Sequence, residues 1–301
     1  MEYPLINFDS IEAFNNYYGL PTCNSYVSVF DLSQGGVHPN RVSIKYNIFV
    51  LYLKQGIRCT INYGRQIYDY KEGTVVSFSP GQLVKVDVPE NSDRPKSQGI
   101  AFMPELIYGT PLQEKVSSFT FLDFTAREAL HLSADEKETF EALLNIIKKE
   151  SGRPTDSHSK MLLSSQIFTL LEYLHRFYDR QFATRHQANS HVVKRFEREL
   201  KQYYSNGKDE ALQMPSVSMF AEQANLSPGY FGELVKRETG LTAKDIITNH
   251  LVLIAKHRLA STTANVAEIA YSLGFEYPAH FTRLFKRVTG ISPSQFRKGC
   301  E

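Results

Sequence analysis

The sequence predicts an α+β protein with a β-rich amino-terminal part and an all-α carboxy-terminal part, and three observations support this. From about residue 26 to residue 102, short β-branched and aromatic runs alternate with turns that contain Gly, Pro or Asn. Near residue 130 the spacing of apolar residues changes from about 2 to about 3.6. Towards the end of the chain, a short basic helical pattern occurs twice, at 231–240 and again at 281–290.

The composition is that of a globular protein of about two domains. The chain has 301 residues, of which 42% are hydrophobic and 22% charged. No apolar run approaches the roughly 20 residues of a membrane-spanning helix, and MEYPLINFDS lacks the basic-then-apolar pattern of a signal peptide. The three cysteines, Cys23, Cys59 and Cys300, form no Cys-x-x-Cys pair, so we expect reduced thiols. We therefore expect a cytoplasmic protein with no membrane partner.

Charge is distributed unevenly along the chain. Residues 1–190 contain 19 Lys and Arg against 21 Asp and Glu, whereas residues 191–301 contain 15 against 11. The net charges are therefore −2 and +4. Binding to a polyanion is expected in the second part.

The amino-terminal runs predict a small antiparallel barrel or sandwich. They include YVSVF, YNIFVLYL, CTINY and TVVSFS, all rich in residues that favour strands. The polar segment PENSDRPKS, at 89–97, is expected to be a loop between two strands.

Two amphipathic helices are predicted next. Ser133 to Glu136 form a capping box, followed by an apolar face of Phe140, Leu143, Leu144 and Ile147. A second helix is expected from Lys160 to about Phe182, with one apolar stripe formed by Leu163, Ile167, Leu170, Leu171, Leu174 and Phe177. The stripe fits either a core face or a dimer seam. Residues 183–191 are expected to be a surface connection, which gives the predicted divisions 1–130, 131–190 and 191–301.

The duplicated segments, FGELVKRETG and FTRLFKRVTG, agree at six of ten positions with a spacing of 50. Each follows a short amphipathic helix and a turn, and Pro228 or Pro278 stands where the new helix begins. Ser227 is a suitable cap for the first, and Gly240 and Gly290 end the two helices. A helix, a tight turn and a second helix make a helix-turn-helix unit, predicted here at about 214–240 and 264–290.

A long helix is expected between the two units. Residues 242–245, Thr-Ala-Lys-Asp, cap a pattern of roughly 18 residues, which would span about 27 Å. A rod of that length suits two recognition helices that enter successive major grooves, roughly 34 Å apart.

Residues 214–298 resemble the DNA-binding domain of the AraC/XylS transcription regulators. The second half, AEIAYSLGFEYPAHFTRLFKRVTGISPSQFR, is similar to that family's signature nearly throughout, including the closing G-x-S-P-x-x-F/Y-R segment at 290–297. The resemblance covers a little under a third of the chain. It implies two helix-turn-helix units joined by a helix, double-stranded DNA as partner, and an activator that contacts RNA polymerase.

The second recognition helix carries the clearest candidates for DNA contacts. Phe281, Leu284 and Phe285 are predicted to face the core. Arg283 is the candidate base reader, because a guanidinium can bond guanine O6 and N7 together, and His280 stands beside it. Lys286, Arg287, Lys236 and Arg237 are expected to meet phosphates, although a solvated basic face is the simpler alternative. The remaining candidates of this helix are Pro278, Ala279 and Thr282.

The first recognition helix has fewer groups that can read a base edge. Its candidates are Ser227, Pro228, Gly229, Tyr230, Gly232 and Glu233. Glu233 fits either acceptance from cytosine N4 or repulsion of phosphate, and Tyr230 fits either the core or the DNA backbone. We predict that this helix contributes shape fit through close backbone approach at its glycines.

The resemblance also implies a cupin-like barrel in front that binds a small effector or mediates homodimerisation. GTVVSFSPGQLV, at 73–84, is similar to a cupin motif at Gly73 and Gly81 but has Ser79 and Val84 where proline and histidine recur. No cluster of His and Glu stands in the strand region to hold a metal, so neither a metal nor another cofactor is expected. The aromatic candidates for an effector site are Tyr46, Phe49, Tyr52, Tyr63, Tyr68 and Phe78, which equally fit a plain core.

Enzyme motifs are absent from the sequence. There is no Gly-rich phosphate loop, no G-x-S-x-G elbow and no His-Glu-x-x-His helix. The sequence predicts a non-enzymatic regulator controlled by an effector, and the alternative is a ligand-independent DNA-binding regulator whose barrel serves protein interaction or dimerisation.

Overall fold

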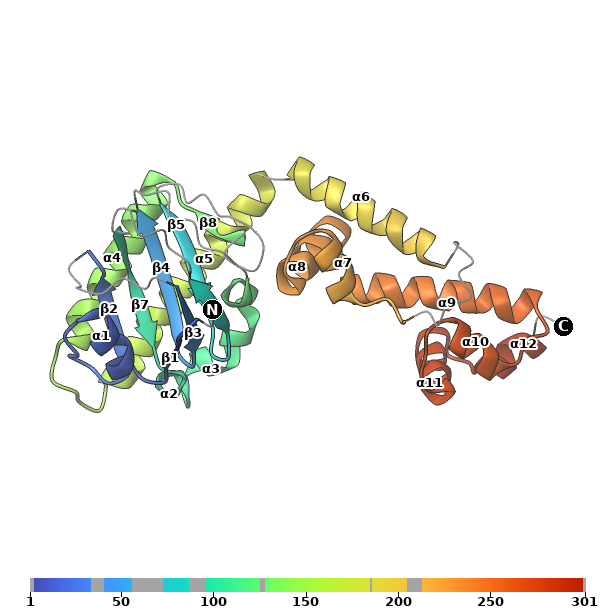
Figure 1. Ribbon diagram of the computed structural model, residues 1–301, viewed down its shortest axis with the longest axis horizontal. Coiled ribbons are helices and arrows are strands. Elements are labelled where there is room, and N and C mark those ends of the chain that lie inside the picture. The colour runs from blue at the N-terminus through green and yellow to red at the C-terminus, as the bar shows by residue number, and fades with distance from the viewer. Residues whose placement is uncertain are drawn as a thin grey trace. The chain divides into compact units, whose positions relative to one another are not determined.

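The computed structural model describes residues 3–33, 41–55, 73–86, 96–124, 128–184, 186–204 and 213–299. The chain divides into two compact units, Met1–Thr184 and Arg185–Glu301. The first is a mixed α+β unit, and the second contains only helices among its described residues (Figure 1).

The strands of the first unit form two sheets. One has the order β1-β3-β6, from Leu5–Phe8, Val42–Tyr46 and Leu83–Val86. The other has the order β2-β7-β4-β5-β8, from Val27–Asp31, Lys96–Phe102, Phe49–Gln55, Thr74–Phe78 and Leu130–His131. Because apolar side chains of both sheets meet in one buried cluster, the described strands form a sandwich.

The sandwich corrects several details of the sequence-based expectation. The pairing of β1 with β3 is parallel, so the sheets are not wholly antiparallel. The described strands fall into two separate sheets, and a cupin-like closed barrel is not confirmed by them. The expected strand CTINY and residues 89–95 of the expected loop lie outside the described residues, whereas Lys96 and Ser97 belong to β7.

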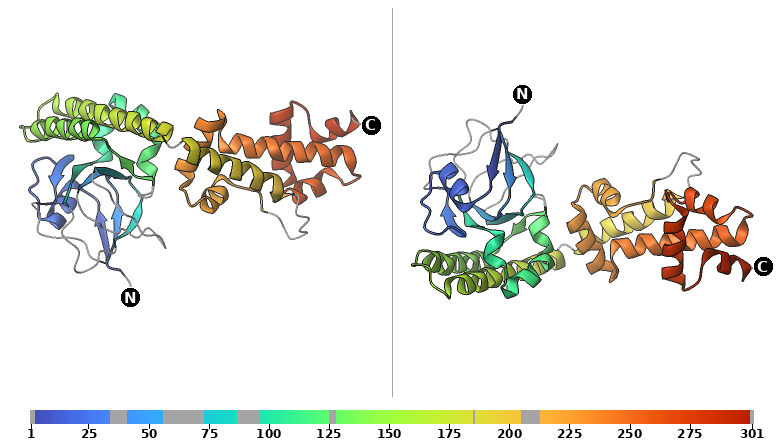
Figure 2. Two further views of the ribbon diagram at one scale, coloured as in Figure 1. Left: turned by 90° about the horizontal axis from the view of Figure 1, so that it is seen from above. Right: turned by 90° about the horizontal axis from the view of Figure 1, so that it is seen from below.

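Short helices surround the sandwich, and two long ones lie along it. The short elements are α1 (Ile11–Tyr18), α2 (Pro104–Ile107), α3 (Pro111–Lys115), η1 (Val116–Ser118) and η2 (Thr120–Asp123). The long helices are α4 (Ala134–Ser151) and α5 (Ser159–Thr184), which lie side by side along one side of the strands (Figure 2).

The structure confirms the predicted cap of α4 and the predicted apolar stripe of α5. Ser133 Oγ accepts from the Glu136 amide, and the Glu136 carboxylate accepts from the Ser133 amide, which completes the capping box. The whole apolar stripe of α5 is buried within the first unit. The stripe is therefore a core face, and its interpretation as a dimer seam is wrong.

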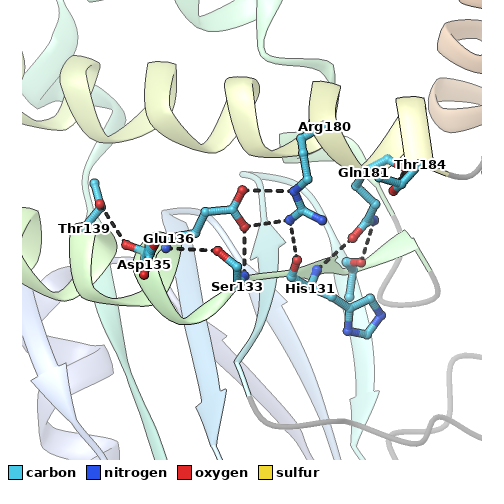
Figure 3. Close-up of polar contacts among 9 residues, drawn as sticks. His131, Ser133, Asp135, Glu136, Thr139, Arg180, Gln181 and Thr184 are labelled. Carbon is cyan, nitrogen blue, oxygen red and sulfur yellow. Dashed lines mark hydrogen bonds and ion pairs between the residues drawn. The ribbon is translucent and has the colours of Figure 1, made fainter.

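A polar network ties the last turns of α5 to β8 and to the start of α4 (Figure 3). The Arg180 guanidinium donates to both Glu136 carboxylate oxygens, at 2.9 and 2.6 Å, and to the His131 carbonyl at 2.7 Å. The Gln181 side chain accepts from the His131 amide and donates to the Ala129 carbonyl. These bonds satisfy backbone groups of β8, a strand of only two residues, and of Ala129 directly before it.

The second unit consists of seven helices among its described residues. They are α6 (His186–Tyr203), α7 (Val217–Gln223), α8 (Pro228–Thr239), α9 (Ala243–Ser261), α10 (Val266–Ser272), α11 (Pro278–Thr289) and α12 (Pro293–Lys298). The boundary between the two units, after Thr184, falls within the expected connection over 183–191, but α6 already begins at His186, so residues 186–191 are helical. Within the described part of the chain, no helix combines the length and apolarity that crossing a membrane would need.

Candidate nucleic-acid interface

The first helix-turn-helix unit is formed by α7 and α8, with α6 packed against both. The Phe196 ring of α6 contacts Phe220 of α7 at 4.9 Å and Phe231 of α8 at 5.2 Å between ring centroids. The turn at 224–227 includes Asn225 at φ 56°, a left-handed conformation that Asn tolerates better than most residues. Ser227 Oγ then accepts from the Tyr230 amide and caps α8.

The second unit repeats this arrangement with a longer turn. Residues 273–277 connect α10 to α11, and Gly274 supplies the left-handed conformation at φ 87°. The Phe281 ring of α11 packs against Phe275 and Phe285, with centroid distances of 5.5 and 5.8 Å. As predicted, both recognition helices end at left-handed glycines, Gly240 at φ 74° and Gly290 at φ 81°.

The connecting helix α9 has the predicted cap and nearly the predicted length. Thr242 Oγ1 accepts from the Asp245 amide, and the helix continues for 19 residues, or about 28 Å at about 1.5 Å per residue. Its buried side chains include Ile247, Leu251 and Leu259. The α7–α8 pair packs at the start of α9, while α10, α11 and α12 pack towards its end (Figure 1).

The closing motif residue Arg297 has a structural role. Its guanidinium donates to the Leu259 carbonyl at 3.1 Å and to the Ala264 carbonyl at 2.6 Å. These bonds satisfy carbonyl groups at and beyond the last turn of α9, which have no partner within the helix. Arg297 therefore fixes α12 against the end of α9.

The outward face of α11 is basic. Ala279, His280, Arg283, Lys286 and Arg287 are exposed, and Pro278 and Thr282 are partly exposed. Phe281 and Phe285 are buried as predicted, whereas Leu284 is only half-buried. This face can offer a guanidinium and an imidazole at its leading turns and further cations behind them.

The outward face of α8 differs from that of α11 in its charge and in the size of its side chains. Pro228, Gly229 and Lys236 are exposed, and Gly232 and Glu233 are half-buried. The Glu233 carboxylate accepts from Arg237 Nε at 2.7 Å, so the predicted phosphate ligand Arg237 is ion-paired within its own helix. This pair was not predicted, although its i,i+4 spacing is visible in the sequence.

Two of the predicted DNA contacts on α8 need correction because their side chains are buried. Tyr230 is 5% exposed and packs in the interior, and Ser227 is buried as the cap of the helix. Their roles in the free protein are packing and capping. The alternative that placed Tyr230 in the core agrees with its burial.

An exposed aromatic residue that sequence reasoning missed stands at the start of α11. Tyr277 is the residue before Pro278, is 55% exposed, and its ring lies edge to face with His280 at 5.5 Å. Because an exposed tyrosine can pack against a sugar and donate its hydroxyl to a phosphate, Tyr277 joins the candidates for DNA contacts. The signal available in the sequence was its place at the entrance of the recognition helix.

One histidine of α9 sits in an unusual environment. Burial, with a smaller contribution from the Lys201 ammonium, lowers the pKa of His250 below its ordinary value of 6.5. Among the described residues, its Nε2 is buried without a hydrogen-bond partner. His250 is therefore neutral near pH 7 and belongs to the packing between α6 and α9 rather than to the exposed basic face.

The described effector candidates of the first unit lie in or beside the sandwich core. Tyr46 and Phe78 stack at 4.7 Å, and Tyr52 meets Phe78 edge to face at 5.8 Å. The Tyr46 and Tyr52 hydroxyls lie 3.4 Å apart, and burial raises the pKa of Tyr52 well above its ordinary value. Phe49 is half-buried and stacks on Phe102, whereas Tyr63 and Tyr68 lie outside the described residues.

A cavity of about 250 Å³ lies elsewhere in the first unit, between the edge strand β2 and the last turn of α4. Its lining includes Ser28, Phe30, Asp31 and Lys148. In the described part of the chain, no three His, Cys, Asp or Glu side chains gather as a metal site.

Comparison with known proteins identifies the carboxy-terminal helices. Residues 220–299 match the family described as a helix-turn-helix domain. The arabinose operon regulatory protein of Salmonella typhimurium is 32% identical over 85 residues, which cover 28% of this chain and 30% of that protein. The HTH-type transcriptional activator RhaS of Escherichia coli is 37% identical over 79 residues, 26% of this chain and 28% of that protein.

A longer match extends beyond the helix-turn-helix units. The Msm operon regulatory protein of Streptococcus mutans is 25% identical over 167 residues, covering 55% of this chain and 57% of that protein. Among solved structures, the C-terminal domain of AraT from Geobacillus stearothermophilus is 27% identical with a TM-score of 0.32, covering 36% of this chain and 84% of that one. The chain thus spans less than a third of the arabinose and RhaS regulators and just over half of the Msm regulator. Residues 220–299 are therefore a helix-turn-helix domain similar to those of AraC-family regulators.

Proposed function

We propose that the protein is a sequence-specific transcription regulator that reads double-stranded DNA with α8 and α11. The observation that carries this proposal is the basic outward face of α11, in a helix-turn-helix unit held against the rod α9. Backbone amides and cations of such a unit meet phosphates, and side chains at its leading turns reach base edges.

The roles on α11 follow from side-chain chemistry. Arg283 is the base reader, because its guanidinium can bond a guanine edge with two parallel hydrogen bonds. His280 lies about one turn before Arg283 and Thr282 directly before it, so both border the same base pairs. Lys286 and Arg287 follow one turn later and bind phosphates, which position the helix without specifying sequence.

On α8, the described surface favours shape over direct readout. Pro228, Gly229 and Gly232 present little side-chain relief, so the helix backbone can approach the duplex closely. Lys236 supplies a phosphate contact behind them. Base readout is therefore concentrated on α11.

The sign of regulation and the further partners are also proposals. A relative with 37% identity over 79 residues bears the name of a transcriptional activator, which supports activation. RNA polymerase is the partner that we propose for such a role. The first unit would then bind a small effector or pair two copies of the chain. A cytoplasmic location and the lack of an enzymatic activity accompany this role.

A second candidate, a ligand-independent regulator, draws support from the sandwich interior. The described effector candidates Tyr46, Tyr52 and Phe78 pack on one another, and two of their hydroxyls face each other. Such a closed cluster serves a core without any ligand. The first unit would then act in protein interaction or dimerisation.

Selection from a random-sequence DNA library with the full chain tests the proposal. Competition binding then compares the selected duplex with mixed-sequence DNA at fixed salt. We expect a preference of at least about 10³-fold for the selected duplex, the lower end for specific DNA-binding proteins. Equal affinity for both duplexes would contradict sequence-specific regulation.

A further inference from the structure

The two recognition helices carry different charges at matching positions. With the spacing of 50 between the duplicated segments, Glu233 corresponds to Arg283 and Arg237 to Arg287. In α8, Lys236 and Arg237 are balanced by Glu233 and Glu238, so its net charge is 0. In α11, Arg283, Lys286 and Arg287 face no acidic residue of the same helix, and its net charge is +3.

The structure shows how part of the charge on α8 is cancelled. Arg237 Nε donates to Glu233 Oε1 at 2.7 Å, and the two side chains are only 31% and 20% exposed. The bond lies on the exposed side of the helix, where a pair at i,i+4 spacing attracts weakly but still favours the paired arrangement of the two charges. At the matching positions of α11, two like charges stand one turn apart and cannot pair with each other.

Beside this pair, Gly232 leaves the helix surface without a side chain. A Cβ atom added at Gly232 would meet no atom within 4 Å, so internal packing does not require glycine there. Glycine inside a helix nevertheless costs stability relative to alanine. The DNA backbone can therefore approach α8 closely beside Gly232. The neutral Glu233–Arg237 pair neither attracts nor repels it.

We infer that Glu233 neutralises Arg237, so that Lys236 is the one cation of α8 left to meet a phosphate and α8 contributes mainly shape fit, while α11 supplies most of the electrostatic attraction. This inference rests on the proposed function. The salt dependence of DNA affinity should therefore come mainly from α11, because only cations that neutralise phosphates release counterions. Glu233 is thereby assigned as a residue that limits nonspecific affinity, and not as a reader of cytosine.

A cycle of three variants in the full chain tests the inference. The variants are Glu233→Gln, Arg237→Gln and the double variant, and the measurement is the dissociation constant as a function of salt. Each is measured on the duplex selected by the wild-type chain and on mixed-sequence DNA. Glu199→Gln is the matched control, because Arg195 Nε and Glu199 Oε1 form a pair of the same i,i+4 spacing and the same 2.7 Å distance on α6.

The expected pattern follows from counting charges. Glu233→Gln removes one negative charge beside Arg237 and steepens the logarithmic salt slope by about 0.9, or about 3.5-fold more affinity lost between 50 and 200 mM salt. It tightens binding to both duplexes at low salt. Arg237→Gln weakens both, and the double variant restores the wild-type slope on both. Glu199→Gln leaves the slope unchanged.

Three other outcomes would overturn the inference. If Glu233→Gln loses affinity only for the selected duplex, Glu233 reads a base. If the double variant loses slope as Arg237→Gln does, Arg237 already binds a phosphate in the wild type. If the wild-type chain binds no DNA at all, the proposed function fails and the inference with it, an outcome that the wild-type titration alone distinguishes.

Discussion

At the scale of single residues, Arg283 and Lys286 separate base readout from attraction to phosphate. Both are exposed on α11, about one turn apart. Replacing Arg283 by Ala should cost about 1 to 3 kcal/mol on the selected duplex and much less on mixed-sequence DNA, because only the correct base edge bonds both guanidinium arms. Competition binding on the two duplexes measures the difference.

Lys286→Gln serves as the comparison on the same helix. This change should weaken binding to both duplexes alike and flatten the salt slope by about 0.9. Equal losses on both duplexes for Arg283→Ala would refute its role as base reader. An unchanged slope for Lys286→Gln would mean that this lysine does not meet a phosphate.

The residue scale also shows where sequence reasoning succeeds. Charged side chains on α11 could be placed outward because Phe281 and Phe285 define the buried face by their spacing. The burial of Tyr230 was harder to predict, since an aromatic residue at a helix start fits either the surface or the core. The Glu233–Arg237 ion pair was also harder to predict, since each side chain could instead contact a group outside the helix. Tertiary packing decides the first case and side-chain geometry the second.

At the scale of elements, the boundaries that sequence predicted well are those set by local chemistry. Ser133 with Glu136, Thr242 with Asp245, and Gly240 all mark helix ends through bonds or conformations within a few residues. The pairing of β1 with β3 was missed, since partners about 38 residues apart leave no local signal. The start of α6 was missed because HQANSH lacks an apolar period.

The packing of α9 against α6 predicts a pH dependence. Burial lowers the pKa of His250 below its ordinary 6.5, so the unfolded chain binds this proton more readily than the folded chain. The contribution of His250 to the free energy of unfolding is therefore full above about pH 6.5 and is lost as the pH falls towards the folded-state pKa.

Urea unfolding of the wild type and of His250→Gln between pH 7.5 and pH 5 measures this contribution. We expect the variant to lose less stability on acidification than the wild type. His257→Gln, at an exposed position of the same helix, controls for the loss of a histidine as such. An identical pH dependence in the wild type and in His250→Gln would contradict the assignment.

At the scale of the whole molecule, the two candidate functions differ in whether the first unit binds a small molecule. A thermal-shift screen of the full chain against sugars, aromatic acids and lipids distinguishes them. A ligand at about 100 times its dissociation constant should add about 2.7 kcal/mol to the free energy of unfolding. A stabilising compound that also changes DNA affinity would support effector control, and no response across these classes would favour the ligand-independent regulator.

The central claim is that α9 holds two unlike readers on one duplex, α11 for bases and charge and α8 for shape. Hydroxyl-radical footprinting of the full chain on its selected duplex tests it most directly, because protection reports the sugar backbone that each helix covers. We expect two protected segments about one helical turn, roughly 34 Å, apart for each copy bound, with Arg283→Ala weakening binding mainly through one of the two half-sites. A single protected segment per copy, with no second half-site at any spacing, would contradict the account.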